Sequence, residues 1–309
     1  MVNFAFIFPG QGAQYVGMGG DLYEQYPAAK VVYEKANKIL GFDISKICFE
    51  GPKEELTRTD ICQPAILITS IAALRSLESI LASVISPAAV LGLSLGEYTA
   101  LVCAGSLTFE DGVYLVRKRG EFMEEASCKN PGTMASIIGL SFKETQEVSE
   151  ETGAQIANLN CPGQIVISGA KERVEAATAL ARQRGAKRTI PLDVSGAFHS
   201  NLMEPAANKL KMEIDKIDIG APKLRVISNV TAKDETTPEE IKDNLVSQVK
   251  SPVLWEDSIR FLASSGINRF IEVGPGKVLA GLLRRIDSTL ECFNAETAAD
   301  ILALKEVLV

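Results

Sequence analysis

The sequence predicts an α/β protein with a largely parallel main sheet and a small inserted subdomain. Two observations support this prediction. Short apolar runs, typical of buried strands, alternate with longer apolar-periodic stretches, typical of helices. Between about residues 128 and 198, the predicted order becomes β-α-β-β-α-β, the ferredoxin-like pattern. We therefore expect a large subdomain formed by residues 1–127 and 199–309, and a small ferredoxin-like subdomain formed by residues 128–198.

The predicted strands of the large subdomain are short and apolar, and cover residues 4–8, 88–93, 223–228 and 269–273. Helical periodicity covers residues 65–81 and 107–126, and the second stretch is preceded by Thr108-x-x-Asp111, a pattern typical of a helix start. We expect each of the last two strands to be followed by a turn and a helix. This alternation predicts a parallel sheet with helices on both faces.

The small subdomain has clear helix boundaries. Ser141 and Glu144 form a capping-box pattern that opens a helix ending near Gly153, and a second helix runs from about Lys171 to Gly185. The predicted strands around these helices cover residues 133–140, 154–160, 164–168 and 187–194. Because no flexible linker flanks the insertion, we expect it to pack closely on the large subdomain.

Composition excludes several classes of function. The chain has 309 residues, of which 46% are hydrophobic, and a net charge of −7, which disfavours nucleic acid and membrane surfaces because both are polyanions. No apolar run approaches the length of a membrane span, and the N-terminal residues lack the pattern of a secretion signal. We expect a cytoplasmic protein, with a monomer as the default state.

The cysteines and the histidine constrain the chemistry. The six cysteines form no C-x-x-C pair, which argues against a disulfide framework and a zinc site. His199 is the only histidine, so metal sites built on imidazole are almost excluded, and any histidine chemistry must use His199.

The segment Gly92-Leu93-Ser94-Leu95-Gly96 follows an apolar strand and precedes a helical stretch, which is the context of a nucleophile elbow. The glycines allow a sharp turn that exposes the Ser94 hydroxyl, and the Leu95 amide points toward the place where an oxyanion would develop. An ordinary strand-to-helix turn is the alternative. The flanking pattern favours Ser94 as a nucleophile.

A serine needs a base to attack a thioester at neutral pH, and His199 is the only imidazole available. It lies just before a helical pattern, and a helix N-terminus would lower the pKa of the ring and keep it neutral. A structural histidine that caps the helix is the alternative, but the Ser94 motif favours the base.

Two other segments are ambiguous from residue chemistry alone. The loop around Gln11 could bring amide groups to a reacting carbonyl, whereas the Gly274–Lys277 turn lacks Walker A spacing and is interpreted as a helix start. Arg119 lies beside apolar positions of a helix, which favours a solvated guanidinium on a buried stem.

Six segments in this order resemble the malonyl-CoA:acyl carrier protein transacylase family: Phe8-Pro-Gly-Gln11-Gly, Gln63-Pro-Ala, Gly92-Leu-Ser94-Leu-Gly-Glu-Tyr, Arg119-Gly, Phe198-His199-Ser and Glu272-Val-Gly-Pro-Gly. The segments extend over almost the whole chain. The resemblance implies an α/β-hydrolase-like core with an inserted ferredoxin-like subdomain and an active site between them. This sequence departs from the usual family pattern at Leu93, where histidine is common.

The resemblance also implies roles for individual residues. Ser94 corresponds to the nucleophile and His199 to its base, and Gln11 with the Leu95 amide corresponds to the oxyanion hole. Arg119 corresponds to the residue that holds the malonyl carboxylate, which a planar guanidinium can grip through two parallel hydrogen bonds.

Two further residues have implied roles beside His199. Gln248 corresponds to the residue that orients the histidine, through either its side chain or its backbone carbonyl. Phe198 resembles the malonyl-selecting version of the motif, because a bulky ring crowds a substituent on the α-carbon.

The implied reaction is ping-pong transfer of malonyl from malonyl-CoA to the phosphopantetheine thiol of acyl carrier protein, for fatty-acid synthesis, through a malonyl-serine intermediate and without a metal or redox cofactor. Alternatives are a transferase that serves a separate polyketide assembly line, a serine thioester hydrolase and an inactive carrier-binding scaffold. Two basic clusters are candidates for carrier docking, although a solvated surface explains them equally well: Arg182, Arg184, Lys187 and Arg188, and Arg284 with Arg285.

Overall fold

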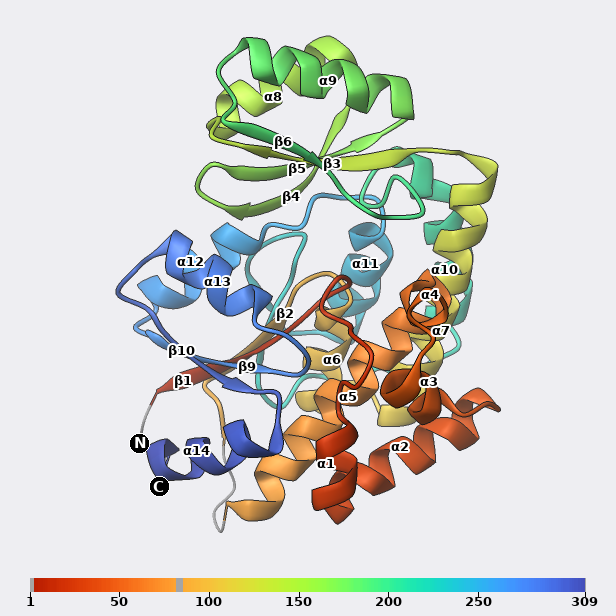
Figure 1. Cartoon of the computed structure of the whole chain (residues 1–309), viewed down its shortest axis with the longest axis vertical. Helices are drawn as coiled ribbons and strands as arrows, with labels where there is room; N and C mark the ends of the chain where they lie inside the picture. The colour runs from red at the N-terminus through yellow and green to blue at the C-terminus, as the bar shows by residue number, and fades with distance from the viewer. Residues whose placement is uncertain (1–2, 82–85, 309) are drawn as a thin grey trace.

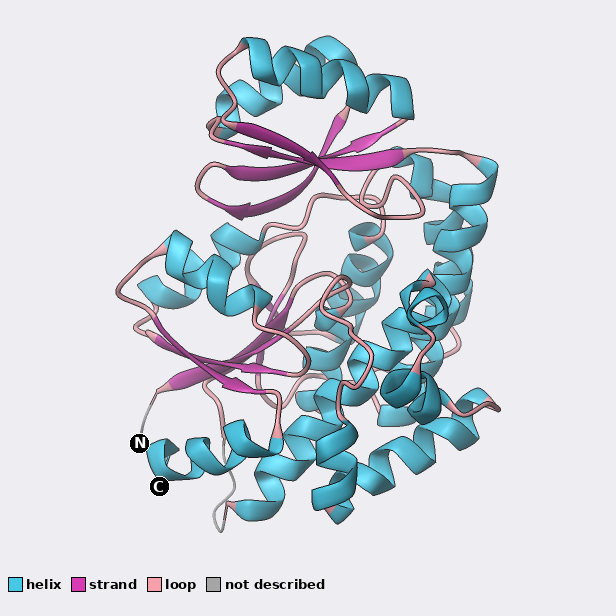
Figure 2. Cartoon of the chain, viewed as in Figure 1, coloured by secondary structure: helices cyan, strands magenta, loops and turns pink. Residues whose placement is uncertain are grey.

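The computed structural model describes residues 3–81 and 86–308, with side chains described up to residue 306; Met1 and Val2, part of the segment tested for a secretion signal, lie outside this range. Two sheets organise the described residues (Figure 2). The larger sheet has the strand order β10-β9-β1-β2-β7-β8, and all of its neighbours are parallel except β7 and β8. Its strands are β1 (Phe4–Phe8), β2 (Ala89–Gly92), β7 (Arg225–Ile227), β8 (Asp234–Glu235), β9 (Arg269–Val273) and β10 (Glu291–Ala295).

Strand β1 shows why the sheet is covered on both faces. Its five residues are all apolar and buried, and successive side chains point to opposite faces. Phe4, Phe6 and Phe8 join one core cluster, whereas Ala5 and Ile7 join another. Figure 1 shows helices on both sides of this sheet. The predicted parallel α/β architecture is confirmed.

The two core clusters contain different helices. The cluster around Ala5 and Ile7 is completed by α12 (Trp255–Ser264) and α13 (Val278–Ile286). The other cluster draws on helices that include α2, α5, α6 and α7. The helices before the small sheet and at the C-terminal end are α1 (Gly20–Gln25), α2 (Pro27–Leu40), α3 (Ile44–Glu50), α4 (Lys53–Thr57), α5 (Thr59–Ile80), α6 (Gly96–Cys103), α7 (Phe109–Lys129) and α14 (Ala298–Leu308).

Helix α5 begins six residues before the predicted stretch and continues through Pro64. Proline lacks the N–H that would bond to the carbonyl of Asp60, four residues earlier. Arg117 Nη1 donates to that carbonyl at 2.6 Å, so a tertiary contact replaces the missing bond. This helix is long and apolar enough to cross a membrane by composition, but 94% of its most apolar window is buried inside the protein.

The small sheet has the strand order β4-β5-β3-β6 and is antiparallel. Its elements follow the predicted β-α-β-β-α-β order: β3 (Thr133–Ile138), α8 (Phe142–Thr152), β4 (Gln155–Cys161), β5 (Gln164–Gly169), α9 (Lys171–Gln183) and β6 (Arg188–Pro191). The Ser141–Glu144 capping box is present, and α8 ends at Gly153 in the left-handed conformation. Figure 1 shows α8 and α9 on the outer face of this sheet, with its inner face toward the large sheet.

A backbone bridge joins the two parts of the molecule. Leu159 of β4 donates its N–H to the carbonyl of Val253, whose own N–H donates to Ala157, both at 2.9 Å. The chain returns from β6 to the large sheet through a 3₁₀ turn (Asn201–Met203) and α10 (Glu204–Ile214), and α11 (Pro238–Gln248) follows β8. One expectation was wrong: the strand at 225–227 is followed by the short antiparallel β8 before the next helix.

Candidate active site

Ser94 lies in a sharp turn between β2 and α6. Its φ is +52°, a left-handed conformation that is uncommon outside glycine. A Cβ at Gly92 would lie 2.0 Å from the Gly96 carbonyl carbon, and one at Gly96 would lie 2.2 Å from the Phe8 carbonyl oxygen. Both flanking residues must therefore be glycine, as the predicted nucleophile elbow requires.

Asn229 holds this elbow from the loop after β7. Its Oδ1 accepts the Ser94 backbone N–H at 2.6 Å, and its Nδ2 donates to the Gly92 carbonyl at 2.7 Å. One side chain thus holds both limbs of the turn. Sequence reasoning missed Asn229, because an asparagine after a short strand carries no local motif.

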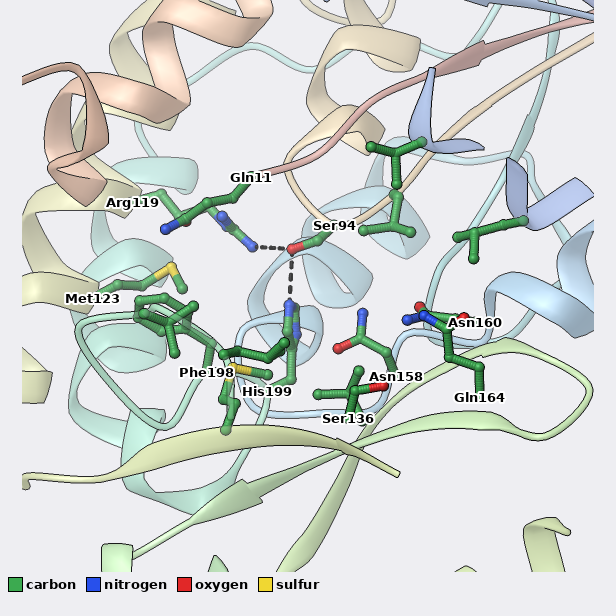
Figure 3. Close-up of a pocket in the computed structure, with 17 residues that line it drawn as sticks. Gln11, Ser94, Arg119, Met123, Ser136, Asn158, Asn160, Gln164, Phe198 and His199 are labelled. Carbon is green, nitrogen blue, oxygen red and sulfur yellow. Dashed lines mark hydrogen bonds between the residues drawn. The ribbon is translucent and has the colours of Figure 1, made fainter. Parts of the chain in front are cut away.

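His199 contacts the Ser94 hydroxyl directly. Its Nε2 lies 2.8 Å from Ser94 Oγ, and its Nδ1 lies 2.8 Å from the backbone carbonyl oxygen of Gln248. A carbonyl can only accept, so Nδ1 carries the proton and Nε2 is left as an acceptor for the serine proton. Figure 3 shows the Ser94 and His199 side chains pointing toward each other. The pair has the geometry of a nucleophile and its base.

The environment of His199 keeps the ring neutral. Burial lowers its pKa from 6.5 to about 4, and the nearby positive charge of Arg119 adds to this effect. The direction agrees with the sequence-based hypothesis. The cause differs, because burial and Arg119, rather than a helix N-terminus, lower the pKa.

Arg119 projects from α7 into the same site and is only 1% exposed. Its Nη1 donates to Gln63 Oε1 at 2.8 Å, and its Nη2 donates to Ser94 Oγ at 2.9 Å and to Gln248 Oε1 at 3.0 Å. The solvated position favoured by residue chemistry alone was therefore wrong. The guanidinium lies beside the serine hydroxyl, as Figure 3 also shows.

The Gln248 side chain forms no hydrogen bond with the imidazole. Its Nε2 donates to the Ser94 carbonyl at 3.0 Å and to Glu97 Oε2 at 2.6 Å. The contact to His199 comes from the Gln248 backbone, which is one of the two arrangements left open by the sequence. Glu97, in the first turn of α6, is fully buried and was given no role from the sequence.

A cavity of about 280 Å³ opens over Ser94. Gln11 and Phe198 line it together with Arg119 and His199. The small sheet contributes polar side chains to the opposite wall, shown in Figure 3: Ser136, Asn158, Asn160 and Gln164. The site therefore lies between the two sheets, and no sequence motif marked these polar residues.

Two backbone amides are available at the site. Within the described residues, the N–H groups of Gln11 and Leu95 donate no hydrogen bond. Gln11 lines the cavity, and Leu95 directly follows the nucleophile. Free amides in such positions can stabilise negative charge on a carbonyl oxygen.

Other features bear on cofactors and docking. In the described part of the chain, no three His, Cys, Asp or Glu side chains are placed to hold a metal ion, and all six thiols are free. Of the basic residues, Arg184 pairs with Glu147 and Glu151 on α8. Arg285 instead donates to Gln164 Oε1 at the cavity, at 2.6 Å.

Comparisons with known proteins show the family of this chain. The acyl transferase domain model matches residues 5–301. The chain is 52% identical to the malonyl CoA-acyl carrier protein transacylase of Bacillus subtilis over 296 residues, which cover 94% of this chain and 92% of the relative.

Solved structures of malonyltransferases also resemble this chain over nearly its full length. The acyl-carrier-protein S-malonyltransferase of Bartonella henselae superposes with a TM-score of 0.96 at 42% identity, covering 99% of each chain. The malonyl-transacylase PlMCAT, solved in complex with a type II polyketide synthase acyl-carrier protein, gives 0.95 at 38% identity, with 99% of each chain covered. The chain therefore belongs to the malonyl-CoA:acyl carrier protein transacylase family of acyl transferases.

Proposed function

We propose that this chain transfers malonyl groups from coenzyme A to the phosphopantetheine thiol of acyl carrier protein through a malonyl-Ser94 intermediate. The observation that carries the proposal is the 2.9 Å distance between Arg119 Nη2 and Ser94 Oγ. In a malonyl thioester, one methylene separates the carboxylate from the reacting carbonyl. A buried guanidinium beside the nucleophile therefore suits a short acyl group that ends in a carboxylate.

In the first half-reaction, His199 Nε2 takes the Ser94 proton while Oγ attacks the thioester carbonyl. The amides of Gln11 and Leu95 stabilise the oxyanion, and Arg119 holds the malonyl carboxylate. The C–S bond then breaks, and the sulfur of coenzyme A leaves with the proton from His199. In the second half-reaction, the carrier thiol gives its proton to His199 and its sulfur attacks the ester carbonyl. The bond from that carbon to Ser94 Oγ then breaks, and Oγ takes the proton back from His199.

The environment supplies two further elements of this mechanism. The low pKa of His199 keeps its ring neutral, so the base is ready at physiological pH. Phe198, 5% exposed on the cavity wall, restricts the space for a substituent on the α-carbon. Every step uses protein side chains, backbone amides and the two substrates, so the proposal includes no cofactor.

We also propose two subdomains and a cytoplasmic location for the protein. Residues 128–198 form the small subdomain and close one side of the site, while residues 1–127 and 199–309 supply the reacting groups. A cytoplasmic location fits six free thiols and a substrate that carries coenzyme A.

Carrier docking is proposed at α13. Val278 and Leu282 of this helix line the cavity, and Arg284 and Arg285 lie in its last turn. The other basic cluster is less suited, because Arg184 is already paired with two glutamates. Charge reversal at Arg284 should raise the KM for the carrier protein, whereas reversal at Lys187 should leave it unchanged.

The test is the intact mass of the protein after incubation with malonyl-CoA, compared with that of Ser94→Ala. A malonyl adduct in the parent alone supports the covalent half-reaction, and no adduct together with no release of coenzyme A contradicts the proposal and favours a scaffold. Adding a carrier protein then separates transfer from hydrolysis, because a transferase yields malonyl carrier and a hydrolase yields free malonate. Carriers of fatty-acid and polyketide synthesis should be compared, and we expect the fatty-acid carrier to be preferred.

A further inference from the structure

We propose that Glu97 is a positioning residue that fixes the Gln248 amide and, through it, the Arg119 guanidinium for an acyl group with a carboxylate. The proposal rests on the malonyl transfer proposed above. It assigns a role in acyl-group selection to a side chain behind the cavity that does not contact the substrate.

Hydrogen bonds give the Gln248 amide one orientation. Its Nε2 faces two acceptors, Glu97 Oε2 at 2.6 Å and the Ser94 carbonyl at 3.0 Å, while its Oε1 faces the donor Arg119 Nη2 at 3.0 Å. Turning the amide by half a rotation would oppose donor to donor and acceptor to acceptor. An ionised carboxylate can only accept, so Glu97 enforces the observed orientation.

Electrostatics gives Glu97 a second effect on Arg119. The guanidinium is 1% exposed, and within the described residues no carboxylate forms a direct ion pair with it. A buried charge without compensation is costly. Glu97, at the far end of the Gln248 bridge, supplies an opposite charge without occupying the face of Arg119 that meets the substrate. Burial raises the pKa of Glu97 from 4.5 to about 7, and the hydrogen bonds from Gln248 and the Asn229 N–H, with the charge of Arg119, oppose that rise. The carboxylate is therefore mostly ionised above pH 7, and the comparison below is made at pH 8.

Arg119 also retains an unused donor. Its Nε is buried and has no hydrogen-bond partner among the described residues. The guanidinium is thus held through Nη1 by Gln63 and through Nη2 by Gln248. Because Gln248 holds the guanidinium without neutralising it, the positive charge remains available for the carboxylate of an acyl group.

A purely structural role predicts a different result. Glu97 Oε2 also accepts the Asn229 backbone N–H at 3.2 Å, so its loss could disturb the elbow itself. A disturbed elbow would slow transfer of every acyl group equally. A disturbed guanidinium would slow only acyl groups that carry a carboxylate.

The experiment compares kcat/KM for malonyl-CoA and acetyl-CoA in the parent and Glu97→Gln, with carrier protein as acceptor. We expect the malonyl-to-acetyl ratio to fall about tenfold, with acetyl transfer nearly unchanged, because the glutamine oxygen can still accept the Gln248 N–H but the negative charge opposite Arg119 is lost. Glu235→Gln is the control, because it replaces another buried glutamate that forms no hydrogen bond with Gln248. Burial and the negative charge of Glu97 raise the pKa of Glu235 to about 9, so its carboxyl is already neutral at pH 8. The change leaves the charge near Glu97 unaltered and should retain the parental ratio.

Gln248→Met provides an independent variant that keeps the side-chain length but removes the amide. It should reduce the ratio at least as much, and adding Glu97→Gln should cause no further loss, because both changes act on Arg119 through the Gln248 side chain. A parental ratio in Glu97→Gln, or equal losses for both substrates, overturns the inference. If Glu97→Gln does not fold, a parental ratio in Gln248→Met overturns it equally. Formation of malonyl-Ser94 by the parent tests the proposed function separately.

Discussion

The neutral His199 leads to a quantitative prediction for the pH dependence of Ser94 reactivity. The perturbation is a change from pH 7.5 to pH 5.5, and the structure sets the pKa of the ring at about 4 instead of 6.5. At pH 5.5, an ordinary histidine would be about 90% protonated, whereas a ring with this pKa stays about 97% neutral. We therefore expect Ser94 reactivity to remain nearly constant, rather than to fall about tenfold.

The assay uses phenylmethylsulfonyl fluoride, a serine reagent with no titrating group, so that the pH dependence belongs to the protein. Sulfonylation is followed by intact mass, with Ser94→Ala as the blank and circular dichroism to verify folding at each pH. A decline in the rate centred near pH 6.5 would refute the reasoning. It would mean that burial and Arg119 do not hold the ring neutral.

The same pKa has a consequence for stability. The folded protein favours the neutral ring, so this contribution is fully present above pH 6.5 and is lost as the pH falls toward 4. The difference between pKa values of 6.5 and about 4 corresponds to about 3 kcal/mol at most. His199→Gln should therefore lose less stability than the parent between pH 6.5 and 4 in urea unfolding.

Other perturbations test the remaining parts of the site. Arg119→Ala should reduce kcat/KM for malonyl-CoA by about 100-fold or more relative to acetyl-CoA, because two charge-assisted hydrogen bonds are lost, and equal losses in a kinetic assay would contradict the clamp. Phe198→Ala should increase transfer of methylmalonyl relative to malonyl in a competition assay, and an unchanged product ratio would count against steric selection. Gly96→Ala should cost several kcal/mol of stability or prevent folding, because its Cβ would lie 2.2 Å from a backbone oxygen. A variant with the same melting temperature as the parent protein would contradict this. Burial raises the pKa of Glu235 to about 9, so its contribution to stability is present below about pH 4.5 and is lost as the pH rises toward 9. Glu235→Gln should therefore stabilise the protein by about 1–3 kcal/mol at pH 8 but not at pH 4.5, and equal effects at both pH values would argue against a buried proton.

Most elements could be predicted from the sequence, because their signals are local. The capping box at Ser141 and the apolar run of β1 are examples in which a few adjacent residues determine the structure. Strand β10 was not predicted, because its residues are mostly half-exposed at the sheet edge and lack a clear apolar pattern. The start of α5 was missed because Pro64 is normally unfavourable inside a helix, and the compensating Arg117 comes from a distant segment.

The parts of the candidate site that have local sequence signals could also be predicted, whereas those that depend on distant residues could not. The Ser94 motif and the single histidine indicated a candidate reacting pair, and the structure places the two side chains 2.8 Å apart. The position of Arg119 came only from the family resemblance, because burial of a charge depends on partners from other elements. The role of Gln248 was open for a geometric reason: a sequence does not distinguish contacts made by a side chain from those made by its backbone.

The contacts of Asn229 change which residues must be considered together when the turn around Ser94 is transferred to another protein. The pentapeptide around Ser94 is continuous, but the amide that holds its two limbs lies 135 residues away from the serine. Grafting the pentapeptide alone onto another strand-to-helix junction would reproduce its sequence but not the Asn229 hydrogen bonds that help to keep Ser94 in a left-handed conformation. A designer who wishes to reuse this elbow must therefore supply an asparagine from a neighbouring strand end, so that the new scaffold closes the turn as this fold does.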